Sequence, residues 1–371
     1  MTERALHIGV DGRELLGQPT GVGRYLREIL REWTGDAAWP HRLSIVVPAP
    51  PPDDLAAALG PRTSWIVAAS PTSGTLWEQW HLPRALRRAR TDVLLASAYT
   101  APVFCPCPFV VVIYDVSYFA HPEWFGAREG LRRRWLTRAA ARRASAVATI
   151  SAFSAAEIER WIGVPAAQIL LAPPGVPVPA APRAPADAGT REPLVLFVGS
   201  LFTRRHIPDL ISGFARAAAH VPGARLVLAG DNRTSPRIDP HTLAGAAGVG
   251  ERVDWRAYVD DGERDRLYRS ARVFAFLSDY EGFAMTPMEA LAHGVAPVLL
   301  DTAVAREVYG DAARYVSAEP ASIGPALTSL LTDEPARQAI VDAGRARLAQ
   351  FSWTRSSAVL RAALERAGTR R

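Results

Sequence analysis

Short apolar runs alternate with longer amphipathic stretches along the whole chain. This alternation is typical of parallel sheets covered by helices, because a strand buried on both faces is apolar at nearly every position. In the first half we expect strands at Leu6–Val10, Leu43–Val47, Val93–Ala96, Val110–Tyr114, Ala146–Ile150 and Ile169–Leu171. The amphipathic periodicity between them predicts helices over Val22–Trp33, Trp77–Ala89 and Leu131–Arg143.

A segment rich in proline and alanine, residues 173–192, has neither a helical nor a strand period, so we place a domain boundary there. The strand pattern then resumes at Leu194–Val198, Arg225–Ala229, Val273–Leu277 and Val295–Leu300, and a terminal helix follows over Phe351–Ala367. We therefore predict two Rossmann-like, doubly wound α/β domains over residues 1–176 and 193–350, a connector over 177–192, and a terminal helix and tail over 351–371. Such domains face each other across a cleft and bind ligands beyond the carboxyl ends of their strands.

The composition is that of a globular protein, with a mean hydropathy of +0.01 and a net charge of +6. All the basic residues counted in that charge are arginines, because the sequence contains no lysine. This charge permits contact with phosphates or an anionic membrane, but no nucleic-acid-binding motif accompanies it, so we expect no nucleic acid partner. The two cysteines, Cys105 and Cys107, are too few for a zinc cage. No run approaches the roughly 20 apolar residues that cross a bilayer. We expect a cytoplasmic protein that at most lies on the inner face of the membrane.

Two glycine-containing turns are candidates for phosphate binding. Gly21 and Gly23 lie at the N-terminus of a predicted helix, but Leu26 stands where a dinucleotide fingerprint needs its third glycine, which argues against a dehydrogenase. Gly199 and Ser200 follow a predicted strand directly, and Arg204 and Arg205 come soon after. Two guanidinium groups at a strand's carboxyl end can clamp a diphosphate, and the alternative is that they face solvent.

The stretch Ser278–Pro297 is the most informative. It predicts a helix with Thr286 as N-cap, Pro287 at the first position and Glu289 completing a capping box. Glu281 lies in the preceding turn, and the main-chain amides of Gly282, Phe283, Ala284 and Met285 would face an anion at the helix start. Glu281 and Glu289 can then bind sugar and ribose hydroxyls, and the alternative for Glu289 is a purely structural capping role.

These residues, from Glu281 to Gly294 together with Gly199–Arg205, resemble the motifs of the retaining glycosyltransferases of family 4, and the resemblance covers nearly the whole chain. It implies the GT-B architecture, with the last helix, which begins near Phe351, crossing back onto the first domain. It implies that Glu281 and the amides of residues 282–285 bind the donor sugar, that Glu289 holds the nucleotide ribose, and that Arg205 binds the diphosphate. Gly21 and Gly23 match the family's glycine loop. We name Glu281 and Arg205 as the catalytic candidates.

Two residues depart from the family pattern. Ser200 stands where many members carry an arginine, so Arg204 and Arg205 would supply the charge. Tyr114, followed by Asp115, stands where a histidine is usual. A phenol is a poor proton acceptor at neutral pH, so Tyr114 either hydrogen-bonds a sugar or packs its ring in the core.

The resemblance implies metal-independent, retaining transfer of a hexose from a GDP- or UDP-sugar, with GDP-mannose as the first expectation and no cofactor. A glycan or lipid-linked oligosaccharide is the expected acceptor. The arginine-rich segment 124–143, with aromatic residues among its arginines, can lie on an anionic membrane; alternatively its arginines face water while Leu131 and Trp135 pack inward. The functional alternatives are a nucleotide-sugar epimerase, a phosphorylase, and a non-catalytic nucleotide-sugar-binding protein.

Overall fold

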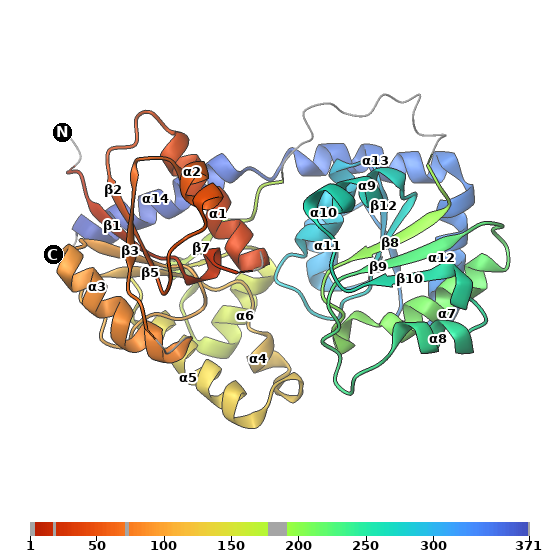
Figure 1. Ribbon diagram of the computed structural model, residues 1–371, viewed down its shortest axis with the longest axis horizontal. Helices are drawn as coiled ribbons and strands as arrows, with labels where there is room; N and C mark the ends of the chain where they lie inside the picture. The colour runs from red at the N-terminus through yellow and green to blue at the C-terminus, as the bar shows by residue number, and fades with distance from the viewer. Residues whose placement is uncertain (1–3, 18–19, 71–73, 177–190, 370–371) are drawn as a thin grey trace. The chain divides into compact units, whose positions relative to one another are not determined.

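The computed structural model describes residues 4–17, 20–70, 74–176 and 191–369, and the chain divides into two compact units. The first unit comprises Met1–Gly175 together with Ser352–Arg371, and the second comprises Val176–Phe351. Each unit contains one parallel sheet with helices packed on both of its faces (Figure 1). Residues 177–190, which make up most of the predicted connector, lie outside the described residues.

The sheet of the first unit has seven parallel strands in the order β3-β2-β1-β4-β5-β6-β7. Its strands are β1 (His7–Asp11), β2 (Arg42–Val47), β3 (Thr63–Val67), β4 (Val93–Ala96), β5 (Phe109–Val112), β6 (Ala146–Thr149) and β7 (Ile169–Leu171). Strands β1 and β4 are neighbours, but the chain continues from β1 to β2 on one side of the pair and from β4 to β5 on the other side. The carboxyl ends of β1 and β4 are therefore its topological switch point, where ligands of such sheets bind.

Helices cover both faces of this sheet. They are α1 (Gly21–Gly35), α2 (Asp53–Leu59), α3 (Leu82–Ala89), α4 (Ser117–Ala120), α5 (Ala127–Arg143), α6 (Ala152–Ile162) and α14 (Trp353–Thr369). Leu82 of α3, Phe119 of α4, Ala141 of α5 and Ile158 of α6 belong to one buried cluster with Val111 of β5. These four helices therefore share one face, and their burial supplies much of the unit's hydrophobic stabilisation.

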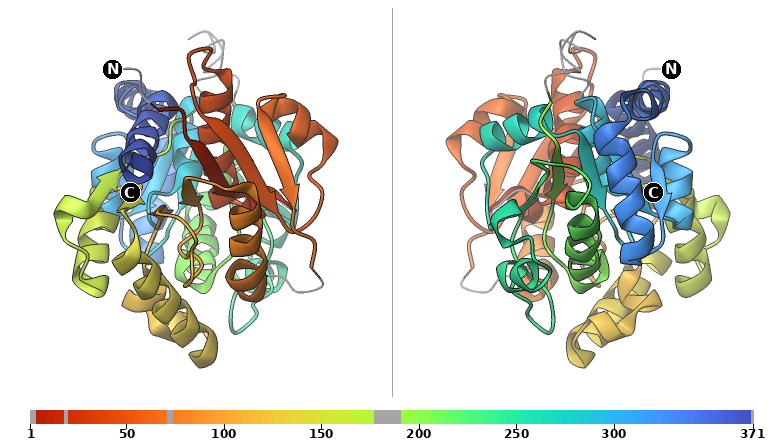
Figure 2. Two further views of the ribbon diagram at one scale, coloured as in Figure 1. Left: turned by 90° about the vertical axis from the view of Figure 1, so that its left-hand side faces the viewer. Right: turned by 90° about the vertical axis from the view of Figure 1, so that its right-hand side faces the viewer.

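The C-terminal helix α14 belongs to the first unit, as the family resemblance implies. It lies against α1 (Figure 2), where Trp33 Nε1 donates to the Ser357 carbonyl at 3.1 Å. His41 is also hydrogen-bonded to Glu365, with 2.8 Å between Nε2 and Oε1. Leu360 and Leu364 are fully buried. The helix therefore completes a core whose other elements come from the first half of the chain.

The second unit has six parallel strands in the order β10-β9-β8-β11-β12-β13. These are β8 (Leu194–Val198), β9 (Arg225–Ala229), β10 (Val253–Arg256), β11 (Val273–Phe276), β12 (Ala296–Leu300) and β13 (Arg314–Val316). Its helices are α7 (Ile207–Ala218), α8 (Pro240–Ala246), α9 (Asp261–Ser270), α10 (Met285–Ala292), α11 (Ala303–Tyr309), α12 (Pro320–Thr332) and α13 (Glu334–Leu348). The switch point of this sheet lies at the carboxyl ends of β8 and β11.

The predicted fold class, two Rossmann-like domains of the GT-B type with a terminal helix returning to the first, is confirmed. The strands named from the sequence are all present, and their ends agree with the structure to within two residues. Three strands, β3, β10 and β13, had no strong sequence signal. All three lie at sheet edges, where one side of the strand stays open and the residues are less uniformly apolar; β10, for example, carries Asp254 and Arg256.

Candidate functional site

Two loops meet at the switch point of the second sheet. The loop after β8 carries Gly199 and Ser200 and leads into the short 3-10 helix η6 (Thr203–Arg205), and the loop after β11 carries Ser278 and Glu281. The loops are joined through their backbones, since the Asp279 amide donates to the Arg204 carbonyl at 3.0 Å. The two segments that the sequence analysis singled out are thus brought together.

Arg205 and Glu281 form an ion pair across these loops. Nε and Nη2 of Arg205 donate to Glu281 Oε1 at 3.1 and 2.8 Å, and Ser278 Oγ donates to the same oxygen at 2.8 Å. The third guanidinium nitrogen, Nη1, donates to the Ser200 carbonyl at 2.8 Å. The guanidinium also lies over the ring of Phe276, 4.7 Å from its centroid. Arg205 is therefore held by three neighbours, Glu281, Ser200 and Phe276, before any ligand arrives.

The electrostatics of the pair favour an ionised carboxylate. Burial acts to raise the pKa of Glu281, but the charges of Arg205 and Arg204 and the hydrogen bonds from Arg205 and Ser278 outweigh it, and the pKa lies below its ordinary value. The side chains of Arg205 and Glu281 remain 12% and 17% exposed. Both groups are thus charged, fixed in place and still accessible at the carboxyl edge of the sheet.

The other candidates after β8 shape the same turn. Gly199 has a φ of 139°, and a Cβ there would lie 2.7 Å from Arg205 Nη1, so the glycine lets the guanidinium approach the backbone. Ser200 contributes its carbonyl to Arg205. Arg204 stacks on Phe202, with its guanidinium carbon 4.3 Å from the ring centroid.

The start of helix α10 differs from the sequence prediction. The helix begins at Met285, its N-cap is Ala284 without a side-chain cap hydrogen bond, and Thr286 lies inside the first turn. The predicted capping box of Thr286 and Glu289 is therefore wrong. Glu289 Oε2 instead accepts from the Tyr268 hydroxyl at 3.3 Å. Glu289 is thus turned toward a neighbouring side chain, which leaves a ligand-binding role open.

Ala284 has the left-handed conformation, with φ 65° and ψ 82°. This conformation is costly for a residue with a Cβ. The buried Tyr309 supports it, since its hydroxyl donates to the Ala284 carbonyl. Phe283 beside it is buried and meets Phe351 edge to face at 5.1 Å. The turn formed by Gly282, Phe283, Ala284 and Met285 is thus held in a strained shape at the edge of the site.

His206, the residue after Arg205, also links the loop after β8 to the loop after β11. Its Nδ1 lies 3.0 Å from Asp209 Oδ2 and its Nε2 lies 2.9 Å from Asp279 Oδ1. Only an imidazolium donates from both nitrogens. The hydrogen bond and charge of Asp279 and those of Asp209 outweigh the effect of burial and raise the pKa of His206. The sequence offers no signal for this bridge, because neither Asp209 nor Asp279 belongs to a distinctive motif.

The candidates of the first unit gather at the carboxyl edge of its own sheet. Gly21 begins α1, whose N-cap Thr20 accepts from the Gly23 amide at 3.0 Å. A Cβ on Gly23 would lie 2.1 Å from the Glu14 carbonyl oxygen, so this position requires glycine. Tyr114 is buried and its hydroxyl donates to the Ser97 carbonyl at 2.9 Å, which matches the packing alternative. Asp115 accepts from the Tyr99 hydroxyl at 3.0 Å.

The arginine-rich helix α5 contradicts one expectation. Leu131 and Trp135 do not pack inward; they are 64% and 59% exposed, and Arg128 and Arg132 are exposed near them. The inward-facing positions are taken by small or shorter residues such as Ala140 and Leu136. Within the described part of the chain, no helix is both long and apolar enough to cross a bilayer.

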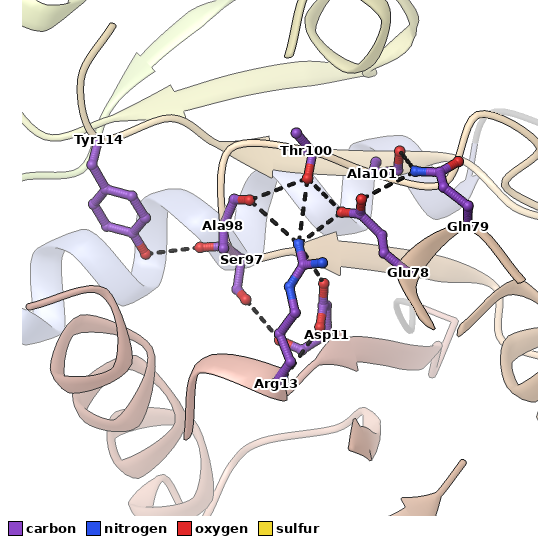
Figure 3. A network of polar contacts seen from close by, with 9 residues as sticks. All are labelled: Asp11, Arg13, Glu78, Gln79, Ser97, Ala98, Thr100, Ala101 and Tyr114. Carbon is purple, nitrogen blue, oxygen red and sulfur yellow. Dashed lines mark hydrogen bonds and ion pairs between the residues drawn. The ribbon is translucent and has the colours of Figure 1, made fainter. Parts of the chain in front are cut away.

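Sequence reasoning missed several residues of these two edges. Ser278 and Tyr309, which hydrogen-bond to Glu281 and Ala284, were not named as site residues, although Ser278 begins the informative stretch Ser278–Pro297. At the switch point of the first sheet, Asp11, Arg13 and Glu78 form a buried ionic network (Figure 3). The position of Asp11 and Arg13 directly after a strand was a usable signal, whereas Glu78 is distant in sequence. Among the described residues, no group of three or more His, Cys, Asp or Glu side chains is arranged to hold a metal ion.

Two family models match the chain. The model described as Glycosyltransferase Family 4 matches residues 19–178, and the model described as Glycosyl transferases group 1 matches residues 182–347. Together they account for most of both units. The chain belongs to family 4 of the glycosyltransferases.

Individual relatives agree with this assignment. The chain is 26% identical over 270 residues to the O-antigen chain mannosyltransferase B of Escherichia coli, a match covering 66% of each protein. It is 31% identical over 195 residues to D-inositol 3-phosphate glycosyltransferase of Mycolicibacterium smegmatis, covering 50% of this chain and 43% of that relative. The chain thus spans less than two thirds of the length of these curated relatives. Anabaena Alr3699/HepE, solved in complex with UDP and glucose, has a similar fold, with a TM-score of 0.75 and 18% identity over 97% of this chain and 100% of that one.

The strain at Ala284 predicts a stabilising substitution. Ala284→Gly should raise the free energy of unfolding by up to about 1 kcal/mol, because glycine adopts the left-handed conformation without a Cβ clash. Ala290→Gly, in the interior of the same helix, is the matched control and should lower it by about 1 kcal/mol. Urea titration of both variants measures the difference. Equal destabilisation by the two substitutions would show that position 284 carries no strain.

The His206 bridge predicts a pH effect. Because its pKa is raised in the folded state, the bridge contributes stability below the unfolded pKa and loses it as pH rises through the folded pKa. The contribution should be below about 1 kcal/mol, since all three side chains are partly exposed. NMR titration should place the His206 midpoint above 6.5, the ordinary value. His206→Asn should remove the pH-dependent part of the stability, and His220→Asn, which changes an exposed histidine after α7, should leave it unchanged.

Proposed function

We propose that this protein transfers a hexose from a nucleotide-diphosphate sugar to a glycan or lipid-linked acceptor, with retention of anomeric configuration and without a metal ion. GDP-mannose is the proposed donor. The observation that carries the proposal is the Arg205–Glu281 pair at the switch point of the second sheet, beside the strained turn before α10. A relative named as a mannosyltransferase supports mannose as the sugar. A fold neighbour solved with UDP and glucose supports a nucleoside-diphosphate sugar as the class of donor.

In this proposal the donor's diphosphate binds at Arg205 and Arg204. Breaking the bond from the anomeric carbon to the phosphate leaves negative charge on the diphosphate, and fixed guanidinium groups and helix amides stabilise that charge. Glu281 accepts hydrogen bonds from the sugar hydroxyls, Glu289 from the ribose, and the leaving phosphate takes the acceptor's proton. In the ligand-free protein Glu281 neutralises Arg205, so donor binding exchanges one partner of the guanidinium for another.

The buried Tyr114 hydroxyl is already used by Ser97, so we assign Tyr114 no direct role in proton transfer. Gly21 and Gly23 are proposed to approach the donor phosphates from the first unit, and Asp115 to lie at the same carboxyl edge. Ser200 binds Arg205 through its carbonyl and supplies no positive charge. Arg204 and Arg205 are therefore the residues that we propose to supply the positive charge for the diphosphate.

Substitution of the pair tests the proposal. Arg205→Met and Glu281→Gln should each lower kcat/KM for sugar transfer by about 100-fold or more, because each removes a group that contacts the donor. Either change leaves its partner without its counter-charge and should cost about 1–3 kcal/mol of stability. Arg306→Gln, which breaks an exposed bidentate pair with Asp301 in the same unit, is the matched control and should retain activity.

The assay combines a donor panel with analysis of the products. Release of GDP from GDP-mannose, with an α-linked product seen by NMR and no effect of EDTA, supports every part of the proposal. Isomerised donor would indicate an epimerase, and phosphate-dependent release of sugar phosphate a phosphorylase. Tight donor binding without turnover against any acceptor would indicate a non-catalytic binding protein. Full activity of both Arg205→Met and Glu281→Gln would disprove the assigned site.

The exposed face of α5 supports peripheral contact with the inner, anionic face of the membrane. Arg128, Leu131, Arg132 and Trp135 are all exposed and spaced so that they share one side of the helix. An arginine near an anionic surface contributes about 1 kcal/mol, and Trp135 can insert its ring at the headgroup level.

Vesicle sedimentation tests this contact. Wild-type protein should sediment with vesicles containing phosphatidylglycerol and stay in solution with phosphatidylcholine alone. Trp135→Ser combined with Arg132→Glu should abolish sedimentation, and Tyr258→Ser, which removes an aromatic residue that is 69% exposed in the second unit, should not. Binding that does not respond to lipid charge, or to the double substitution, would refute the proposal.

A further inference from the structure

Helix α10 begins with an unusual hydrogen bond. The carbonyl of an N-cap residue ordinarily accepts from the amide four residues further on, as Thr302 does from Arg306 at the start of α11, at 2.9 Å. At the start of α10 the Ala284 carbonyl accepts from the Tyr309 hydroxyl instead. Within the described part of the chain, no hydrogen bond joins this carbonyl to the Met288 amide. A side chain of another helix thus completes the first turn of α10.

The Tyr309 hydroxyl is a permanent donor at this position. Tyr309 ends α11, and its side chain is 1% exposed. Burial and the charge of Glu281 hold the pKa of the hydroxyl well above its ordinary value, while the Met288 amide acts in the opposite direction. The hydroxyl therefore keeps its proton across the physiological pH range. The bond to Ala284 does not depend on the titration of Tyr309.

The helix that carries Tyr309 is fixed at the same end. Arg347 Nε donates to the Val308 carbonyl at 2.7 Å, and the Tyr315 hydroxyl donates to the Gly310 carbonyl at 2.6 Å. These bonds satisfy carbonyl groups that the end of a helix leaves open. The hydroxyl is thus presented from a rigid element of the second unit.

The bond to the carbonyl also sets the direction of an amide. The Ala284 carbonyl and the Met285 N–H belong to one planar trans peptide group, so they point in opposite directions. Because the carbonyl points at the buried Tyr309, the Met285 N–H points away from it. The described residues supply no acceptor for this N–H. Tyr309 therefore aims an open main-chain donor.

One hydroxyl is enough to decide the conformation of Ala284. A left-handed backbone is costly for a residue with a Cβ, by an amount comparable with the loss of one hydrogen bond to a buried carbonyl. Without the hydroxyl, nothing would offset the strain of the turn, and Ala284 would relax toward the ordinary backbone regions. The Met285 N–H would turn with it.

Tyr309 is placed to act on a ligand through this turn and not by contact. Tyr309, Ala284 and Glu281 line a common cavity of about 20 Å³. That volume is enough for about one water molecule. A sugar therefore does not reach the Tyr309 ring through it.

We infer that Tyr309 is a positioning residue for the donor, because its hydroxyl fixes the peptide group of Ala284 and Met285 so that the Met285 N–H faces the bound donor. This inference rests on the proposed function, in which the main-chain amides before α10 contact the donor. It makes the backbone conformation of Ala284 the property on which these contacts depend. A glycine at position 284 should then need Tyr309 less than alanine does.

NMR of the ligand-free protein, labelled only at its methionine nitrogens, tests the geometry. The chain has three methionines, Met1, Met285 and Met288, so the labelling reports on the two amides in question. Tyr309→Phe removes only the hydroxyl and should shift the Met285 and Met288 signals. Tyr25→Phe, which removes a buried hydroxyl bonded to a main-chain carbonyl at 2.8 Å in the first unit, is the matched control and should leave both signals in place. Circular dichroism and thermal melting establish that each variant is folded.

Titration with GDP-mannose tests what this geometry does. Tyr309→Phe should raise the Kd about tenfold, the factor expected for one well-placed hydrogen bond, and Tyr25→Phe should not. In the Ala284→Gly background the same change should raise the Kd by no more than about threefold, because glycine keeps the left-handed turn without support. GMP, which lacks the second phosphate and the sugar, should bind equally to all variants. A purely structural role would weaken both ligands alike.

The outcomes separate this inference from the proposed function. Unchanged methionine signals in folded Tyr309→Phe would overturn the positioning role, and so would an equal increase in Kd with alanine and with glycine at position 284. Equal weakening of GMP would overturn it as well. If Tyr309→Phe does not fold alone, its combination with the stabilising Ala284→Gly still gives the Kd, and a tenfold loss relative to Ala284→Gly would contradict the inference. Failure of every nucleotide sugar to bind would refute the proposed function, while the ligand-free spectra would still show whether Tyr309 fixes the peptide group.

Discussion

The right-handed crossover between parallel strands is the constraint on which both units depend. Because every strand of a sheet runs in the same direction, all the strand-to-helix turns emerge at one edge, and the reversal in strand order opens a space between two of them. Residues far apart in sequence, such as Arg205 and Glu281, meet there without long loops. The helices and the apolar strands hold this edge in place, and the polar side chains of the candidate site lie on it.

Both switch points use the same physical device, a guanidinium fixed by carboxylates. An isolated surface arginine loses side-chain entropy when it is fixed in one position, whereas Arg13 and Arg205 are already held by their carboxylate partners. The two points differ in their charge balance. Arg205 faces one carboxylate and has Arg204 beside it, while Arg13 lies between two carboxylates.

Much of the fold was predictable from the sequence because buried parallel strands are apolar at nearly every position. Edge strands such as β10 lack that signature, and their existence depends on pairing with β9, which a linear pattern does not record. The candidate site was predictable where a motif is continuous, as it is from Glu281 to Glu289. Its geometry was not, because Ala284 adopts a left-handed conformation that its side chain disfavours and that the hydroxyl of Tyr309 supports. Apolarity alone left open whether Leu131 and Trp135 pack inward, and the structure shows that the buried face of the helix is occupied by Gly130, Leu136, Thr137, Ala140 and Ala141 instead.

The position of α14 sets the order in which the protein can form during synthesis. Trp33 and Ser357 are hydrogen-bonded although 324 residues separate them. Every residue of the second unit therefore leaves the ribosome before the first unit receives its last helix. Until then the apolar groove that Leu360 and Leu364 fill is open to solvent. The unit that is translated first is therefore the unit whose core is completed last.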